Sequence, residues 1–220
     1  MATNDTARTA ALFDLDGVIV DTEGRYTDFW RKIGAETLGI PGFGDAIKGR
    51  TLEAIFDTYY KGKPELQAII TEELDRFERE MPYDFIPGAM HFIRTLRERN
   101  VPVAVVTSSN RKKMENVYAR HPGFKETFDR IFTGEDFPRS KPAPDCYLLG
   151  MKTFGATAAS TVIFEDSYTG LKAARDSGGF VVGLATTNTR EDIAPLADKV
   201  IDNFTQISAD DLTYMLRSRL

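Results

Sequence analysis

The stretch AALFDLDGVIVDTE (Ala10–Glu23) joins a short apolar strand to two acidic residues. Its first four residues predict a buried strand, and Asp14, Asp16 and Gly17 follow. A carboxylate in apolar surroundings costs free energy unless it is paired or bound to a metal. Because residues i and i+2 of an extended chain point the same way, we expect Asp14 and Asp16 to face one ligand. Gly17 would let the chain turn there without a Cβ clash.

Short apolar runs recur along the rest of the chain and alternate with helical patterns. The expected strands after the first are residues 101–107, 130–133, 161–165, 180–184 and 198–201. The expected helices between them are residues 88–100, 111–120, 143–155 and 167–178. Strands that alternate with helices predict an α/β fold with a doubly wound parallel sheet, which is a Rossmann-like core.

Residues 19–85 interrupt this alternation, because no strand pattern occurs there. Three helical patterns, at residues 24–39, 51–60 and 64–80, predict an all-helical cap domain inserted directly after the first strand. We therefore expect a core formed by residues 1–18 and 86–220 and a cap formed by residues 19–85. The chain would cross twice between the two, which suggests a hinged cap over the edge of the sheet.

Composition narrows the function classes. The net charge is −5 and no basic stripe occurs, so a nucleic-acid partner is not expected. Cys146 is the single cysteine, which excludes an internal disulfide and a paired-cysteine metal site. The first ten residues are polar, and no apolar run reaches membrane-spanning length. We expect a soluble, cytoplasmic, monomeric protein without a membrane partner.

Polar residues follow several of the other predicted strands. They are TSSN (Thr107–Asn110), Lys141 in KPAPD, and the pair Glu165 and Asp166. Ligands of open parallel sheets bind beyond the carboxyl ends of the strands, so these groups should meet. Carboxylate oxygens suit Mg²⁺, whereas a lysine with hydroxyls and N–H groups at a helix start suits a phosphate. A carboxylate can attack phosphorus, and a second acid can move the proton.

Four segments in this order carry a resemblance to a known family. FDLDGVIVDT, VVTSSN, KPAPD and FEDSYTG, with a helical insert after the first, resemble the motifs of the haloacid dehalogenase-like superfamily of phosphotransferases. The most similar branch is the β-phosphoglucomutase-like one, which has a helical cap. The resemblance covers nearly the whole chain and implies an enzyme that transfers phosphoryl groups.

The resemblance implies a role for each residue of the phosphoryl-transfer machinery. Asp14 would be the nucleophile and Asp16 the general acid and base. Thr107 and the Ser108 amide would hold the phosphoryl oxygens, and Lys141 would neutralise the nucleophile and the phosphate. Asp16 also argues against true dehalogenase chemistry, because dehalogenases of the family usually lack this second aspartate.

The resemblance also implies a Mg²⁺ cofactor. Asp166 and the Asp14 carboxylate would bind the ion together with the Asp16 carbonyl. Glu165 would be either a further ligand or a base that acts through the ligands, and this alternative stays open.

Candidate specificity residues lie in the cap and after the second core strand. The segment IKGRT (Ile47–Thr51) joins two cap helices, and in the resembling family this loop reaches the substrate. Lys48, Arg50 and Thr51 are therefore substrate candidates together with Ser109 and Asn110 of the core. The alternative is that the loop is an exposed basic turn. The run RKK (residues 111–113) is expected to be a solvated first helical turn.

Three departures from β-phosphoglucomutase concern the surroundings of the substrate. Tyr26 stands where the mutase has a histidine, Arg50 follows Lys48-Gly49 where it has a small apolar residue, and Asn110 replaces a lysine. We therefore expect a Mg²⁺-dependent phosphohydrolase of small phosphorylated metabolites, most of all sugar phosphates. The alternatives are a β-phosphoglucomutase-type isomerase and, third, a non-catalytic metabolite-binding protein.

Overall fold

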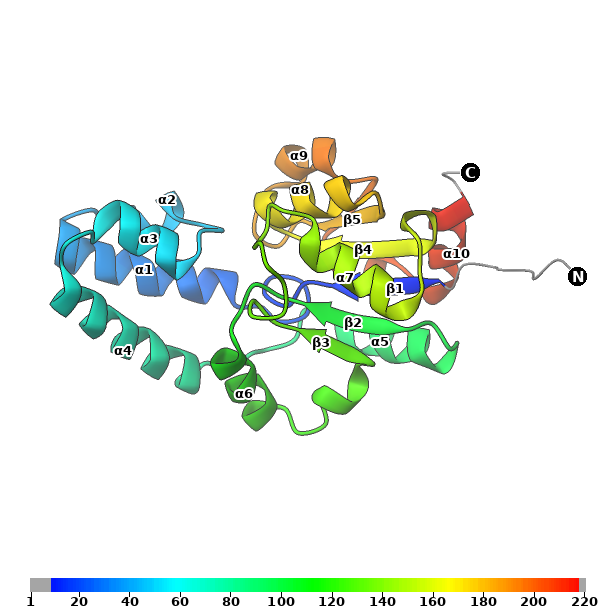
Figure 1. Ribbon diagram of the computed structural model, residues 1–220, viewed down its shortest axis with the longest axis horizontal. Helices are drawn as coiled ribbons and strands as arrows, with labels where there is room; N and C mark the ends of the chain where they lie inside the picture. The colour runs from blue at the N-terminus through cyan, green and yellow to red at the C-terminus, as the bar shows by residue number, and fades with distance from the viewer. Residues whose placement is uncertain (1–8, 218–220) are drawn as a thin grey trace, which may run out of the picture.

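A parallel six-stranded sheet forms the centre of the computed structural model, which describes residues 9–217 (Figure 1). The strands are β1 (Ala10–Phe13), β2 (Val103–Val106), β3 (Arg130–Phe132), β4 (Thr161–Glu165), β5 (Phe180–Leu184) and β6 (Lys199–Ile201). Their order is β3-β2-β1-β4-β5-β6, and every neighbouring pair is parallel. The predicted doubly wound α/β core is confirmed.

Helices cover both faces of the sheet. The helices of the core are α5 (Ala89–Glu98), α6 (Arg111–Arg120), α7 (Asp145–Phe154), α8 (Tyr168–Ser177), α9 (Arg190–Ile193) and α10 (Ala209–Arg217). In β1, Phe13 packs with α5 and α10 on one face, whereas Leu12 packs with α7 and α8 on the other. This alternation explains why the central strands are apolar on both sides and completely buried.

The cap lies beyond the carboxyl ends of the strands (Figure 1). Its helices are α1 (Glu23–Leu38), α2 (Phe43–Ala46), α3 (Leu52–Tyr59) and α4 (Pro64–Glu80). They share an apolar cluster centred on Trp30, Phe43 and Ile70. The short helix α2 was not expected, because a single turn leaves no periodic pattern in the sequence. Over residues 9–217, no helix combines the length and the apolar composition that a membrane crossing requires.

The two connections between core and cap run next to each other. The Asp21 N–H donates to the Asp84 carbonyl at 2.8 Å, and the Ile86 N–H donates to the Ile19 carbonyl at 2.9 Å. Ile19 and Tyr83 belong to the apolar cluster of the core. The helical part of the cap is thus Glu23–Glu80, and the boundaries at residues 18/19 and 85/86 stay a prediction.

Candidate active site

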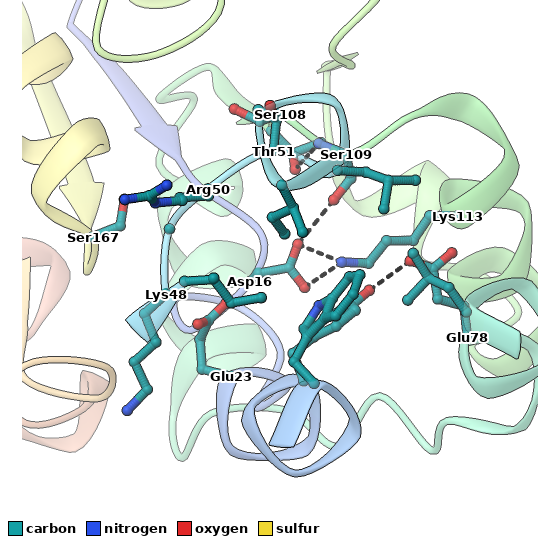
Figure 2. A pocket seen from close by; sticks show the side chains of 18 of the residues that line it. Asp16, Glu23, Lys48, Arg50, Thr51, Glu78, Ser108, Ser109, Lys113 and Ser167 are labelled. Atoms are coloured by element: carbon teal, nitrogen blue, oxygen red, sulfur yellow. Dashed lines mark hydrogen bonds and ion pairs between the residues drawn. The ribbon is translucent and has the colours of Figure 1, made fainter. Parts of the chain in front are cut away.

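A cavity of about 470 Å³ lies between the cap and the carboxyl ends of the strands (Figure 2). It brings together residues that are far apart in the sequence. The predicted site residues that line it are Asp14, Asp16, Lys48, Arg50, Thr51, Thr107, Ser108, Ser109, Asn110, Lys141 and Asp166. Glu165 lies behind this wall and is completely buried.

Asp14 occupies the position directly after β1, between β2 and β4. Its N–H donates to the Phe164 carbonyl at 3.0 Å, and its Oδ1 accepts a hydrogen bond from Lys141 Nζ at 2.8 Å. Burial raises the pKa of the Asp14 carboxyl to about 7, although the Lys141 charge works against this rise. Asp14 is therefore a buried carboxylate whose main protein partner is a cation.

Lys141 is fixed by three acceptors. Its Nζ donates to Asp14 Oδ1, to the Val106 carbonyl at 3.0 Å and to Glu165 Oε1 at 2.6 Å. Burial alone would lower the pKa of Lys141, but the charges of Asp14 and Glu165 outweigh it and hold the pKa above its usual range. The lysine is thus a permanent, immobile positive charge at the floor of the cavity.

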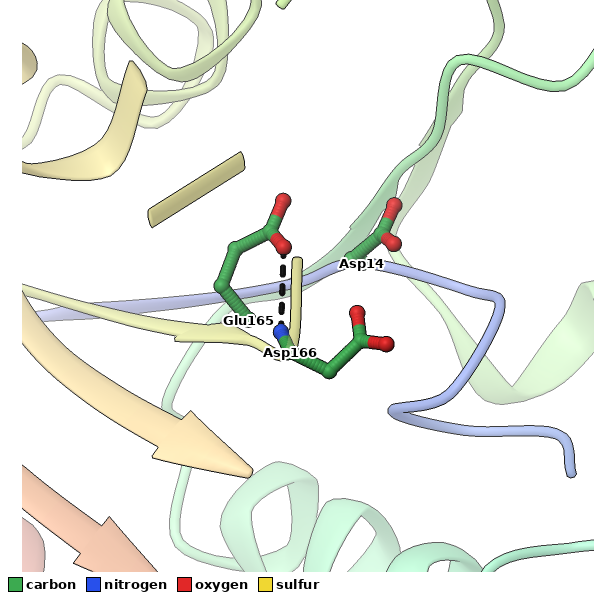
Figure 3. Close-up of side chains that lie close together, drawn as sticks. All are labelled: Asp14, Glu165 and Asp166. Atoms are coloured by element: carbon green, nitrogen blue, oxygen red, sulfur yellow. Dashed lines mark hydrogen bonds between the residues drawn. The ribbon is translucent and has the colours of Figure 1, made fainter. Parts of the chain in front are cut away.

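Asp14, Glu165 and Asp166 form an acidic cluster (Figure 3) in which one oxygen of each lies within 4.8 Å of the others. Both Glu165 oxygens are already engaged. Its Oε1 accepts from Lys141 and from the Tyr147 hydroxyl at 2.6 Å, and its Oε2 accepts from the Asp166 N–H at 3.1 Å. Glu165 therefore holds Lys141 and the Asp166 backbone in place.

One oxygen of Asp166 has no hydrogen-bond partner in the described part of the chain. Its Oδ2 accepts a hydrogen bond from the Thr187 hydroxyl, whereas its Oδ1 is buried and has no partner among residues 9–217. Burial, with the nearby charges of Glu165 and Asp14, raises the pKa of Asp166 well above its usual range. Buried polar atoms rarely stay unpaired, and carboxylate oxygens are the ligands that Mg²⁺ prefers. The donor set therefore fits this ion.

Gly17 makes the close approach of these groups possible. Its φ is +70°, the left-handed region, and a Cβ at this position would overlap the Asp166 carboxylate and the Thr187 hydroxyl. The expected role of Gly17 in a turn without Cβ is confirmed. The structure also shows why a Cβ does not fit there, because Asp166 lies against Gly17.

Asp16 faces the same cavity as Asp14, as the alternation predicted. Its carboxylate accepts hydrogen bonds from Thr22 Oγ1 at 2.5 Å and from Ser109 Oγ at 2.9 Å, and Lys113 Nζ donates to both oxygens. Burial alone would raise the pKa of Asp16, but the Lys113 charge and these hydrogen bonds outweigh it and lower the pKa below its usual value. Asp16 is therefore held as a carboxylate by donors from three segments.

The segment after β2 supplies hydroxyl and N–H groups. The Ser109 N–H donates to Thr107 Oγ1 at 3.0 Å, which forms a tight turn, while Ser108 is exposed at the surface of the cavity. Asn110 caps α6, because its Oδ1 accepts the Lys113 N–H at 2.8 Å. Its carbonyl oxygen is thus engaged in the helix cap.

The cap loop lines the opposite side of the cavity. Thr51 caps α3 by accepting the Ala54 N–H, Lys48 pairs with Asp45 at 3.4 Å, and Figure 2 shows Arg50 beside Ser167. The loop therefore faces the cavity, as expected from a specificity loop. The substrate-binding roles of Lys48, Arg50 and Thr51 stay predictions.

Lys113 corrects an expectation drawn from the sequence. The run RKK was expected to be solvated, but Lys113 is only 5% exposed and pairs with Asp16. Helical spacing could have revealed it, because Lys113 lies beside Met114 and Val117 on the inward face of α6.

The cap contributes three further carboxylates that the sequence did not single out, those of Glu23, Asp75 and Glu78. All three line the cavity, and Glu78 accepts a hydrogen bond from the Tyr26 hydroxyl. Burial raises the pKa of Glu23 to about 7, and the charge of Asp16 adds to this. The cap side of the cavity is therefore more acidic than its basic loop suggested.

Comparison with protein families identifies the class of protein. The model of the haloacid dehalogenase-like hydrolases matches residues 9–178, which include all the proposed catalytic and metal-binding residues. The chain belongs to this family, and the resemblance inferred from its motifs is confirmed.

Two relatives of the chain are named as phosphatases. The chain is 27% identical to the validoxylamine A 7'-phosphate phosphatase of Streptomyces hygroscopicus subsp. limoneus over 90% of this chain and 94% of that protein. It is also 27% identical to the bifunctional riboflavin kinase/FMN phosphatase of Arabidopsis thaliana, over 89% of this chain but 53% of that longer protein. The crystal structure of β-phosphoglucomutase from Clostridium difficile superposes with a TM-score of 0.78 at 23% identity, covering 96% of this chain and 98% of that one, which shows a shared fold.

Proposed function

We propose that the protein is a Mg²⁺-dependent phosphohydrolase of small phosphorylated metabolites that works through an aspartyl phosphate on Asp14. The observation that carries the proposal is the position of the Asp14 carboxylate. It lies at the floor of the cavity, 2.8 Å from the Lys141 ammonium. Asp166, whose buried Oδ1 has no partner within residues 9–217, belongs to the same acidic cluster. Relatives that are named as phosphatases support it.

The first step proposed is attack by an Asp14 oxygen on phosphorus. The bond from phosphorus to the substrate oxygen breaks. Asp16, which first takes up a proton from solvent, passes that proton to the oxygen so that an alcohol leaves. Thr107 and the Ser108 N–H would hold the phosphoryl oxygens, and Lys141 would neutralise the charge on them. In the second step Asp16 takes a proton from water, the water oxygen attacks phosphorus, and Asp14 is released with inorganic phosphate.

Asp14 and Asp166 would hold Mg²⁺ through their carboxylates, together with the Asp16 carbonyl. The bound ion would supply further positive charge for the phosphoryl group during transfer. Glu165 acts through the others in this proposal, because both of its oxygens already accept hydrogen bonds from Lys141, Tyr147 and the Asp166 N–H. Its task would be to orient Lys141 and Asp166.

The cavity supports a small, hydroxyl-bearing substrate. Its volume of about 470 Å³ lies in the range of small-molecule sites. On the cap side it offers the Glu23 and Glu78 carboxylates, the Thr27 hydroxyl and the Trp30 ring. Carboxylates and hydroxyls accept hydrogen bonds from the hydroxyl groups of a substrate. An aromatic ring packs against the carbon skeleton of the same substrate. We therefore propose sugar phosphates as the substrate class.

A sugar-phosphate mutase is the second candidate. The basic residues Lys48 and Arg50 on the cap side of the cavity favour it, because they could bind a second phosphate of a bisphosphate intermediate. A mutase must also shield the aspartyl phosphate from water, whereas a phosphatase needs water as the acceptor.

A ³¹P NMR time course tests both functions. The protein is mixed with Mg²⁺, β-glucose 1-phosphate and a trace of the 1,6-bisphosphate, and the Asp14→Asn variant serves as the control. Growth of inorganic phosphate that is absent with the variant supports the phosphohydrolase, and a panel of sugar phosphates then defines the substrate. Glucose 6-phosphate without free phosphate would support the mutase, and full activity of Asp14→Asn would refute the aspartyl phosphate.

A further inference from the structure

We infer that Lys113 is a positioning residue that fixes the orientation of the Asp16 carboxylate and links this orientation to the cap. The inference rests on the proposed function, in which Asp16 moves the proton. Lys113 belongs to none of the motifs from which the site was predicted.

The geometry of the ion pair is that of an orienting contact. Lys113 Nζ lies 2.7 Å from Asp16 Oδ1 and 2.6 Å from Oδ2, so that it bridges the two oxygens (Figure 2). Only 6% of the Lys113 side chain and 16% of the Asp16 side chain are exposed, so water screens the pair little. The remaining donors to Asp16, Thr22 and Ser109, are hydroxyls that each bind one oxygen.

Lys113 is itself held by a rigid element. It lies in the first turn of α6, and its N–H is bound by the Asn110 cap. The next residues on the same face, Met114 and Val117, are buried in the core cluster. A cation carried by a capped, packed helix can define where a flexible carboxylate points.

The other side of Lys113 faces the cap. Its Nζ lies 4.5 Å from the centre of the Tyr26 ring of α1, which is a cation–π contact. The Tyr26 hydroxyl donates to Glu78 Oε1 of α4 at 2.8 Å, so the ring is held by a second cap helix. Lys113 thus lies between the core acid Asp16 and the aromatic ring of Tyr26 on cap helix α1. Docking of the cap would complete the surroundings that hold Lys113 against Asp16.

The neighbouring lysine provides a matched control. Lys112 also pairs with a cap residue, Asp75 of α4, but its side chain is 61% exposed and its ion-pair partner is Asp75 instead of Asp16. Replacement of either lysine by Met removes one positive charge from the same helical turn and one link to the cap. Only Lys113→Met removes the contact with Asp16.

The test uses the leaving group of the substrate. An alkyl phosphate needs a proton on its leaving oxygen, whereas p-nitrophenyl phosphate releases a stable phenolate that needs little help from Asp16. We expect Lys113→Met to lower kcat/KM at least 50-fold for a sugar phosphate but less than fivefold for p-nitrophenyl phosphate. Lys112→Met is expected to change both substrates by a similar factor.

Two more variants exclude a general structural effect. Lys113→Gln keeps a hydrogen-bond donor and most of the side-chain volume but removes the charge. It replaces Lys113→Met in the test if that variant does not fold, and the same selective loss is expected. In the Asp16→Asn background, Lys113→Met is expected to cost less than twofold, because there is no carboxylate left to orient. Equal losses for both substrates, or additive losses in the double variant, would overturn the inference.

The outcomes separate this inference from the proposed function. If Asp14→Asn keeps full activity, the proposed function fails and the role of Lys113 fails with it. If Asp14→Asn is inactive but Lys113→Met shows no dependence on the leaving group, only the positioning role is refuted.

Discussion

Lys141 Nζ lies 2.6 Å from Glu165 Oε1, and the two side chains are 5% and 0% exposed. The pair connects the loop after β3 to the last residue of β4 and lies directly behind Asp14. Because Asp14 accepts from the same ammonium, Glu165 determines where the positive charge of the site is placed. A residue outside the cavity thus helps to build its floor.

Glu165→Gln should damage both stability and activity. Breaking a buried ion pair is costly, but Lys141 keeps Asp14 as a partner, so we expect unfolding free energy to fall by about 3 kcal/mol. Turnover should fall roughly 10- to 100-fold, as is usual when a group that orients a site is removed. Urea unfolding and steady-state kinetics measure the two effects.

Arg139→Gln is the control for this prediction, because it removes an ion pair with Asp145 in which the arginine is 70% exposed. It should change the unfolding free energy by less than about 1 kcal/mol. Equal effects of the two variants would contradict the importance assigned to Glu165.

Gly170 lies in α8, and Gly170→Ala should disturb the ion pair between Lys141 and Glu165. A Cβ on Gly170 would overlap the Glu165 carboxylate, so the side chain would have to move away from Lys141. We expect a loss of about 1–3 kcal/mol of unfolding free energy, as for other overpacked sites, together with a clear fall in turnover. Gly24→Ala in α1 meets open space and should instead stabilise by up to about 1 kcal/mol. Full activity of Gly170→Ala would mean that the position of Glu165 matters little.

Mg²⁺ should stabilise the fold, because Asp14, Glu165 and Asp166 gather three carboxyl groups that would bind the ion in the native state but lie apart in the unfolded chain. At a concentration 100 times the dissociation constant, a ligand of the native state adds about 2.7 kcal/mol. Thermal unfolding in MgCl2 should therefore give a higher Tm than unfolding in EDTA at equal ionic strength. Asp166→Asn should lose most of this shift, and an unchanged shift would place the ion elsewhere.

Ionisation of the Cys146 thiol should lower the stability of the fold at alkaline pH. Cys146 is completely buried in α7, and burial raises the pKa of its thiol to about 11. A thiol in the unfolded chain has a pKa of about 8.5, so the unfolded state loses its proton first as the pH rises. The stability that this group contributes is complete below that pH and is lost as the pH rises toward 11.

Two measurements check this prediction. The thiol should react with an aromatic disulfide reagent at pH 8 only when urea unfolds the protein. The fall in stability between pH 9 and 11 should be smaller in Cys146→Ala than in the wild type. Rapid labelling of the native protein would contradict the burial of this cysteine.

Local patterns in the sequence predicted much of the site. The side-chain period of two predicted that Asp14 and Asp16 face the same side, and both line one cavity. Parallel strands bring their carboxyl ends to one edge of the sheet. The proximity of Lys141, Asp14 and Asp166 followed from this topology, because each comes directly after a strand or in the loop beyond it. The structure confirms these positions.

Other features of the site depend on contacts between elements that the sequence does not relate. The period of α6 shows only that Lys113 lies near an inward face, whereas its partner Asp16 is 97 residues away. Tyr147 and Glu78 belong to no sequence motif. In the structure the Tyr147 hydroxyl donates to Glu165, and Glu78 accepts from the Tyr26 hydroxyl.

The sequence by itself therefore determined the α/β class, the inserted helical cap and the acidic residues at the strand ends, because these follow from hydrophobic periodicity and chain direction. Only the tertiary structure decided that Lys113 holds Asp16 and that Glu165 holds Lys141. Such pairings depend on the packing of whole helices and of the cap against the core. A buried charged group is costly without a partner, and the packing decides which group lies close enough to pair with it.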